Sequence, residues 1–284
     1  MSHTLEKYFV PEPSWYPVFC SVALLLFAGG ATAWLNDMSG GPVVFFAGLA
    51  LLFYMLFGWF GQVIRESESG KYNKQVDRSF RWSMGWFIFS EVMFFGAFFG
   101  ALFYARVLSV PWLSSGDTEM WLWQGFEGVW PSDGPNPRAD GFTPMGAWGI
   151  PALNTLLLLT SGATLTWAHH GLVKGRRGQL EKGLLLTILL GVTFICFQAY
   201  EYVHAYSDLN LRMSSGVYGS TFYLLTGFHG IHVTIGAIML IVMYFRSRAG
   251  HFTQDQHFGF EAAAWYWHFV DVVWLGLFVV VYWL

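Results

Sequence analysis

Acidic and histidine side chains recur at helical spacing inside long apolar runs of this 284-residue sequence. Glu201 and His204 stand three residues apart, and so do His229 and His232. Spacing of i, i+3 places both members of a pair on one face of a helix. Glu-x-x-His is also the ligand spacing of di-iron carboxylate proteins. These four residues therefore allow two hypotheses: a membrane di-metal oxidase, or structural hydrogen bonding between helices.

The number of ligands favours the structural hypothesis. A di-metal site of this kind uses two Glu-x-x-His motifs and two further glutamates. The sequence has one such motif within an apolar run, and Glu91 is the only other glutamate deep in such a run. A Cys-x-x-Cys-His heme attachment motif and a phosphate-binding glycine loop are both missing. We therefore predict no metal site and no catalytic residue in this chain.

Glu91 needs a reason of its own, because a carboxyl group inside a membrane is costly. It lies about ten residues into an apolar run, in the segment SEVMFF at 90–95. Its two possible roles are equally supported by the sequence: a functional carboxyl group that relays a proton, or a structural one that hydrogen-bonds a neighbouring helix.

Two further histidine pairs lie in or beside apolar runs. His268 and Asp271 repeat the i, i+3 spacing, and a hydrogen bond between them would satisfy both side chains in lipid. His169 and His170 end another apolar run beside a basic loop, which predicts that they anchor the chain at the membrane surface.

Composition places these residues in a membrane protein. The chain is 55% hydrophobic and 12% charged, whereas a soluble domain has about 25% charged residues. So few charged residues cannot cover a water-soluble protein, so we expect lipid to surround the chain. The net charge of −3 offers no basic field for phosphates, so we exclude a nucleic-acid partner.

Seven apolar runs are long enough to cross a bilayer, which requires about 20 residues in a helix. Because lipid cannot satisfy backbone amides, these runs must be helical. We predict an all-α, polytopic protein that forms a single membrane domain over 1–284. The predicted transmembrane helices are Pro17–Leu35, Val43–Ile64, Trp82–Ala105, Gly149–Ala168, Gly183–Val203, Thr221–Phe245 and Ala262–Leu284.

Basic residues divide unequally between the two ends of these spans. Twelve lie on the side of the N-terminus, including those of a basic loop at 65–81, and three lie on the other side, which accounts for all fifteen. The three are Arg106, Arg138 and Arg212. Because basic loops stay inside, we predict a cytoplasmic or matrix N-terminus and an outer loop at 106–148.

Trp59, Arg65, Glu66 and Arg246 lie where two of the spans meet the inner surface. Basic residues between helices suit an anionic lipid headgroup, and an aromatic ring suits the acyl chains. Ordinary positive-inside topology explains the same arginines, so both interpretations stay open at this point.

Specific sequence motifs resemble those of cytochrome c oxidase subunit III, and the resemblance covers essentially the whole chain. The motif with the highest specificity is HFGFEAAAWYWHFVDVVWL at 257–275. The others are HFT (251–253), GVYGSTF (216–222), TGFHGIHV (226–233), TWAHH (166–170), VIRES (63–67) and SEVMFF (90–95).

The resemblance implies a fold and a role. It implies two bundles, helices one and two within 1–64 and helices three to seven within 82–284, around a V-shaped cleft that holds phospholipid. It implies a subunit without heme or copper that packs mainly against subunit I, which carries the hemes and one copper. Subunit II of the same complex receives electrons from cytochrome c, and the complex reduces oxygen and pumps protons. Membership of a larger respiratory supercomplex is a further possibility.

Site residues carry over by the same resemblance. The family's lipid contacts correspond to Trp59, Arg65, Glu66 and Arg246, and its reactive membrane carboxylate corresponds to Glu91. The alternatives are subunit III of a quinol oxidase, the di-metal oxidase and, third, a solute transporter. The long loop at 106–148 and the connection at 205–215 favour a bacterial inner membrane over a mitochondrial one.

Overall fold

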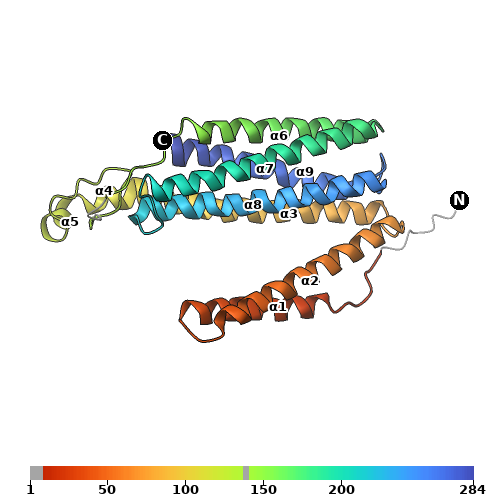
Figure 1. Cartoon of the computed structure of the whole chain (residues 1–284), viewed down its shortest axis with the longest axis horizontal. Coiled ribbons are helices and arrows are strands. Elements are labelled where there is room, and N and C mark those ends of the chain that lie inside the picture. The colour runs from red at the N-terminus through yellow and green to blue at the C-terminus, as the bar shows by residue number, and fades with distance from the viewer. Residues whose placement is uncertain (1–8, 137–140) are drawn as a thin grey trace. The chain divides into compact units, whose positions relative to one another are not determined.

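The computed structural model describes residues 9–136 and 141–284, and all regular secondary structure in these ranges is helical (Figure 1). This result confirms the predicted all-α class. Lys7 and Arg138, which contribute to the charge asymmetry, lie outside the described residues.

Seven helices within the described ranges have 20 residues or more, and each contains one of the predicted spans or most of it. They are α1 (Tyr16–Leu35), α2 (Gly41–Glu68), α3 (Lys74–Phe103), α6 (Ile150–Val173), α7 (Arg177–Ser207), α8 (Gly216–Ala249) and α9 (Phe258–Leu277).

Several of these helices extend beyond the apolar runs. Because α2 ends at Glu68 and α3 begins at Lys74, most of the expected basic loop at 65–81 is helical. The side chain of Asn73 explains where α3 begins, since its Oδ1 accepts hydrogen bonds from the backbone N–H of Gln75 (3.1 Å) and Val76 (3.0 Å). Asparagine is a preferred residue at this capping position.

The predicted outer loop at 106–148 is also partly helical. From α3 the chain continues through the π-helical segment η1 (Tyr104–Ser109) into α4 (Val110–Leu113) and then α5 (Gly116–Trp121). Pro111 lies in α4, directly after η1. At the other end of the chain, η2 (Phe278–Trp283) continues α9.

Six of the long helices are long and apolar enough to cross a membrane, and α6 is not among them. The 24 residues of α6 include no Lys, Arg, Asp or Glu. Its asparagine, threonine, serine and histidine side chains lower its mean hydropathy. The structure therefore supports a membrane protein with six candidate spans.

The chain divides into two compact units, Met1–Phe80 and Arg81–Leu284. In the first unit, α1 and α2 form a hairpin with very close backbones. A Cβ atom added at Gly30 would lie 2.3 Å from the backbone nitrogen of Phe45, and one added at Gly48 would lie 2.4 Å from that of Phe27. Such small residues allow helices in lipid to approach closely.

The core of the second unit is built around tryptophans of α9. Trp267 is fully buried, and its Nε1–H donates a 2.9 Å hydrogen bond to the Ser161 hydroxyl of α6. The same indole lies against Gly191 of α7 and Gly236 of α8, where an added Cβ would come within 2.5 Å and 2.9 Å of the ring. One side chain thus contacts three neighbouring helices and fixes their spacing.

Candidate functional site

A partly buried acid–histidine pair links α3 to α8 in the second unit. The Nε2 atom of His232 lies 2.9 Å from Oε2 of Glu91, and the two side chains are 12% and 20% exposed. Phe95 meets the imidazole edge-on and Tyr266 stacks parallel to it, with ring centroids 4.9 Å and 6.3 Å away. The structure therefore brings together two residues that the sequence analysis treated separately.

The second ring nitrogen shows how many protons this pair holds. Nδ1 of His232 lies 2.6 Å from the carbonyl oxygen of Phe228. A carbonyl oxygen can only accept, so Nδ1 carries a hydrogen. The 2.9 Å contact with Glu91 therefore contains one proton, either on the imidazole or on the carboxyl group.

The side chains of Glu201 and His204 have different partners, although the two residues are only three apart on α7. Glu201 is 1% exposed and accepts a 2.6 Å hydrogen bond from the Tyr282 hydroxyl of η2. His204 is 39% exposed, and its Nδ1 lies 2.6 Å from Oδ2 of Asp208. This hydrogen bond lowers the pKa of Asp208, which lies just beyond the end of α7.

His229 has a structural contact of its own. Its Nε2–H donates to the Val270 carbonyl of α9 at 3.2 Å, and its ring packs near Phe194 and Trp274. The four residues of the di-metal hypothesis thus have four different partners. Among the described residues, the one group of three possible metal ligands is His169, His257 and Glu261, which includes none of the four.

The predicted hydrogen bond between His268 and Asp271 is wrong. The Nδ1–Oδ2 distance is 3.9 Å, which is too long for a hydrogen bond. The Asp271 carboxylate instead packs over Gly162 of α6, and Nε2 of His268 lies 3.5 Å from the Thr166 hydroxyl. Both residues therefore contribute to the contact between α9 and α6.

Three of the expected lipid-binding residues lie in the first unit. Trp59 is 47% exposed and stacks on Phe60, and Arg65 is exposed at the end of α2. Glu66 accepts hydrogen bonds from Gln62 (2.8 Å) and from the Tyr72 hydroxyl (3.0 Å).

Tyr72 keeps its hydroxyl proton in this arrangement. Its burial and the hydrogen bond to Glu66 raise the pKa of Tyr72. It therefore remains a donor to the Glu66 carboxylate.

The fourth expected lipid-binding residue, Arg246, lies in the last turn of α8 in the second unit. Its guanidinium group lies 4.7 Å from the centroid of the Phe252 ring, and it also approaches Gly259 at the start of α9. A cation over an aromatic face is favourable, so the protein holds this arginine at the end of the bundle.

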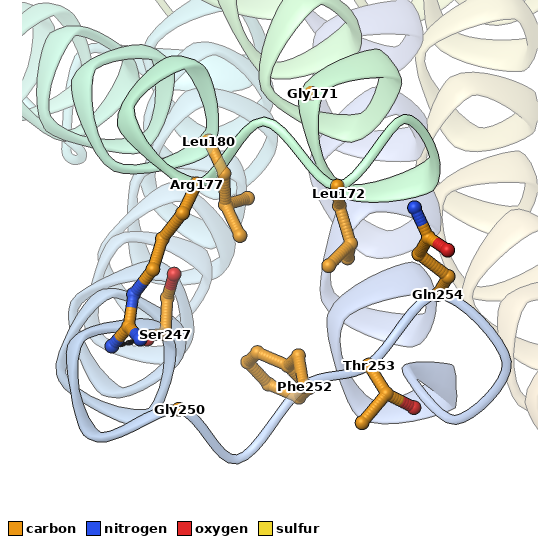
Figure 2. A pocket seen from close by; sticks show the side chains of 10 residues that line it. Gly171, Leu172, Arg177, Leu180, Ser247, Gly250, Phe252, Thr253 and Gln254 are labelled. Atoms are coloured by element: carbon orange, nitrogen blue, oxygen red, sulfur yellow. Dashed lines mark hydrogen bonds between the residues drawn. The ribbon is translucent and has the colours of Figure 1, made fainter.

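Arg177 closes the gap between the start of α7 and the end of α8 (Figure 2). Its Nη2 donates to the carbonyl oxygens of Ser247 (3.0 Å) and Arg248, and its Nε donates to Glu181 at 3.1 Å. It lines an open pocket of about 220 Å³ together with Phe252 and other residues of the 250–254 loop. Because its guanidinium is bonded within the protein, this pocket resembles a packing defect more than an anion site.

The sequence analysis missed the importance of Arg81 and Glu261. They form an ion pair between the first residue of the second unit and the first turn of α9. The predicted topology already placed the two residues on the same side of the membrane, because each directly precedes a predicted span that begins on that side. Pairing them requires knowing that α3 and α9 are neighbours, which hydropathy does not show.

Comparison with known proteins gives a consistent result along the chain. A profile of the family "Cytochrome c oxidase subunit III" matches residues 6–284. The chain is 41% identical to cytochrome c oxidase subunit 3 of Latimeria chalumnae, 42% identical to that of Hippopotamus amphibius and 41% identical to that of Scyliorhinus canicula. Each of these alignments covers 100% of the chain and 99% of the relative.

Proposed function

This chain belongs to the cytochrome c oxidase subunit III family, and we propose that it serves as subunit III of a proton-pumping heme–copper oxidase in aerobic respiration. The observation that carries the proposal is the match over the full length of both chains at 41–42% identity. An insertion of a new catalytic domain would have broken that alignment.

In this role the chain is non-catalytic and holds no heme or copper of its own. Its main contact is subunit I, which holds the hemes and one copper, and it also assembles with subunit II. The contacts of two histidines within the spans support the assignment of the hemes and copper to the partner subunits. His229 donates to a backbone carbonyl and His232 pairs with Glu91, so both are engaged in contacts between helices.

We propose that all seven long helices cross the membrane, including α6. Its length of 24 residues suffices for a bilayer, and its polar groups find partners on neighbouring helices. Thr164 bonds Thr187 of α7 at 2.8 Å, and Ser161 accepts from Trp267 of α9. The charge asymmetry supports a cytoplasmic N-terminus and a periplasmic C-terminus in a bacterial inner membrane, with the mitochondrial inner membrane as the alternative.

Phospholipid binding is the second part of the proposed role. By family resemblance, Trp59, Arg65, Glu66 and Arg246 contact lipid in a V-shaped cleft between helices one and two and the remaining bundle. The exposed ring of Trp59 and the exposed guanidinium of Arg65 at the end of α2 support this assignment. Aromatic side chains suit acyl chains, and arginine suits a phosphate headgroup.

Glu91 is the proposed functional carboxyl group of the chain. Its single shared proton with His232, held between α3 and α8, supports a role in proton uptake or in access to the active site of subunit I. We propose that this pair helps the complex to sustain turnover. Of the other polar residues in the spans, Glu201, His229, His232, His268 and Asp271 hold the helices together. The contact of His204 with Asp208 instead lies at the end of α7.

The long helices also bear on the alternatives. Subunit III of a quinol oxidase usually has five helices, whereas this chain has α1 and α2 in addition to the five long helices that follow. Cytochrome c is therefore the proposed electron donor to the complex. The di-metal oxidase loses support because its four ligands have separate partners.

Deletion of this chain tests the proposed role. We expect membranes of the deletion strain to retain the heme and copper spectra of the oxidase, because other subunits hold them. Initial oxygen consumption should persist, whereas activity should decay within fewer turnovers than in the wild type. Unchanged activity decay, or complete loss of the heme spectrum after re-expression of the partner subunits alone, would reject the role.

A further inference from the structure

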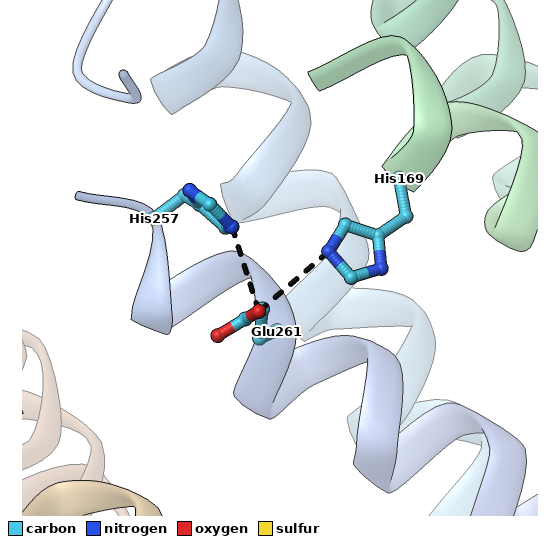
Figure 3. Close-up of side chains that lie close together, drawn as sticks. All are labelled: His169, His257 and Glu261. Atoms are coloured by element: carbon cyan, nitrogen blue, oxygen red, sulfur yellow. Dashed lines mark ion pairs between the residues drawn. The ribbon is translucent and has the colours of Figure 1, made fainter. Parts of the chain in front are cut away.

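Three potential metal ligands converge where α6 ends and α9 begins (Figure 3). His169 comes from the last turns of α6, His257 directly precedes α9, and Glu261 lies in the first turn of α9. One ligand atom from each lies within 4.8 Å of the others. All three belong to the second unit, so their arrangement does not depend on the position of α1 and α2.

The distances match the geometry of a bound metal ion. Oε1 of Glu261 lies 3.4 Å from Nε2 of His257 and 3.7 Å from Nε2 of His169. Two ligands of a tetrahedral zinc ion, each 2.0–2.2 Å from the metal, are about 3.3–3.6 Å apart. The distance to His257 falls in this range and the distance to His169 lies just above it, while the ligand atoms of the two histidines lie within 4.8 Å of each other.

Local hydrogen bonds prepare His257 as a ligand. Its Nδ1 lies 3.0 Å from the carbonyl oxygen of Thr253, and a carbonyl only accepts, so Nδ1 carries a hydrogen. In the neutral ring this leaves the lone pair on Nε2, which points toward Glu261. The turn itself is fixed by the Gln256 N–H, which donates to the Thr253 hydroxyl at 3.0 Å. A hydrogen bond of this kind to the far nitrogen is the usual support of a metal-binding histidine.

His169 offers a second nitrogen in the same direction. Its ring packs against Phe260 and near His257, with centroids 5.5 Å and 5.9 Å away. Its Nε2 is buried and has no hydrogen-bond partner among the described residues. A lone pair facing a carboxylate oxygen is repulsive, so a proton or a cation must lie between them. We propose that His169, His257 and Glu261 bind a divalent transition-metal ion, with zinc as the best match.

The ligand set selects the class of ion. Two imidazoles and one carboxylate suit zinc and its first-row neighbours, whereas magnesium and calcium prefer oxygen ligands. Arg81 pairs with the other carboxylate oxygen, Oε2, so Glu261 offers Oε1 as a single donor. The positive charge of Arg81 opposes the ion, and we therefore expect weaker binding than at a structural zinc site.

A bound ion would join the end of α6 to the start of α9. These ends lie on the inner side in the proposed topology, so the ion would come from that compartment. The binding itself does not depend on the proposed oxidase role. The sequence analysis predicted no metal in this chain. His257 and Glu261 are four residues apart, but two long helices separate them from His169 in the sequence.

Zinc retention by the purified complex tests the site. The full chain is isolated with its partners in mild detergent, treated with a chelator, titrated with zinc chloride and passed through a desalting column. Zinc per chain is measured by mass spectrometry for the wild type and for H169A, H257A and H204A. His204 is the matched control, since it also pairs with a carboxylate but lies at the opposite end of α7 from the basic loop.

We expect the wild type and H204A to bind one zinc more per chain than H169A and H257A, with affinity lowered about tenfold or more in each ligand variant. X-ray absorption of the wild type should show two imidazole ligands. Equal retention by all four proteins, or no retention by the wild type, would overturn the site. If H257A fails to assemble, H169A decides alone, because His169 is partly exposed. The heme spectrum of the same sample reports the oxidase role separately.

Discussion

At the scale of single residues, the contact between Glu91 and His232 joins α3 to α8 through one hydrogen bond. Replacing Glu91 by glutamine keeps the shape and leaves an amide N–H that can donate to Nε2 of a neutral imidazole. The variant removes the titratable carboxyl group without leaving a buried atom unsatisfied. The variant therefore tests the contribution of the proton on Glu91 separately from the packing of its side chain.

We expect Glu91→Gln to assemble normally and to shorten the period over which the complex sustains oxygen consumption. The measurement is the decay of activity over successive turnovers. Glu201→Gln is the matched control, because Glu201 is also a buried acid but accepts from Tyr282 in a separate contact. If Glu91→Gln decays like the wild type, the pair is only a packing contact between helices.

The proposed lipid residues make a second prediction at this scale. Replacing both Arg65 and Arg246 by alanine should release tightly bound anionic phospholipid, because each arginine contributes a charge at the inner surface. Lipid per complex is measured by mass spectrometry after extraction. The double variant of Lys174 and Arg176 removes the same charge from the same side and should leave the lipid content unchanged. Full lipid retention in the first variant would reject the assignment.

The sequence predicted which polar side chains lie within the spans, but it did not predict which of them contact each other. Glu201 and His204 are separated by about 60° around the helix axis, which was enough for one to turn inward and the other outward. Their neighbours decided the outcome, namely Tyr282 of η2 and Asp208 beyond α7. Such partners follow from the packing of helices that are distant in sequence.

At the scale of elements, α1 and α2 can approach closely because a glycine of α1 lies on the side that faces α2. Gly30 touches the backbone of α2, whereas its neighbour Gly29 has no atom within 4 Å of an added Cβ. The two adjacent positions therefore form a matched pair for testing the close approach of the helices.

We expect Gly30→Val to destabilise the first unit by about 1–3 kcal/mol, because backbone atoms must move to admit the side chain. Gly29→Val should have little effect, since its side chain would face open space. Protease sensitivity of the hairpin and the yield of assembled complex measure the difference. Equal effects of the two substitutions would contradict this description of the contact.

The positions of the helices were predictable, because hydropathy is a local property of the sequence. Their ends were less so, since caps such as Asn73 and turns outside the apolar run decide where a helix begins. Helix α6 is the clearest example. Its apolar run was recognised, yet its hydroxyl groups lower its hydropathy, and their partners on α7 and α9 become visible only in the folded bundle.

At the scale of the whole molecule, the chain consists of a helical hairpin and a larger helical unit. The exposed surfaces of both units carry many large apolar side chains, among them Phe57, Trp86 and Val272. Such a surface needs lipid or partner subunits around it. The family match implies that the chain belongs to a complex with other subunits, and the proposed role rests on that match.

The most direct test is isolation of the tagged chain in mild detergent, with an optical spectrum and metal analysis of the eluate. We predict that heme and copper co-purify with two larger partner chains and leave when those chains are stripped away. A solitary, heme-free chain that carries stoichiometric iron would contradict the accessory-subunit role and return the di-metal oxidase as the better hypothesis.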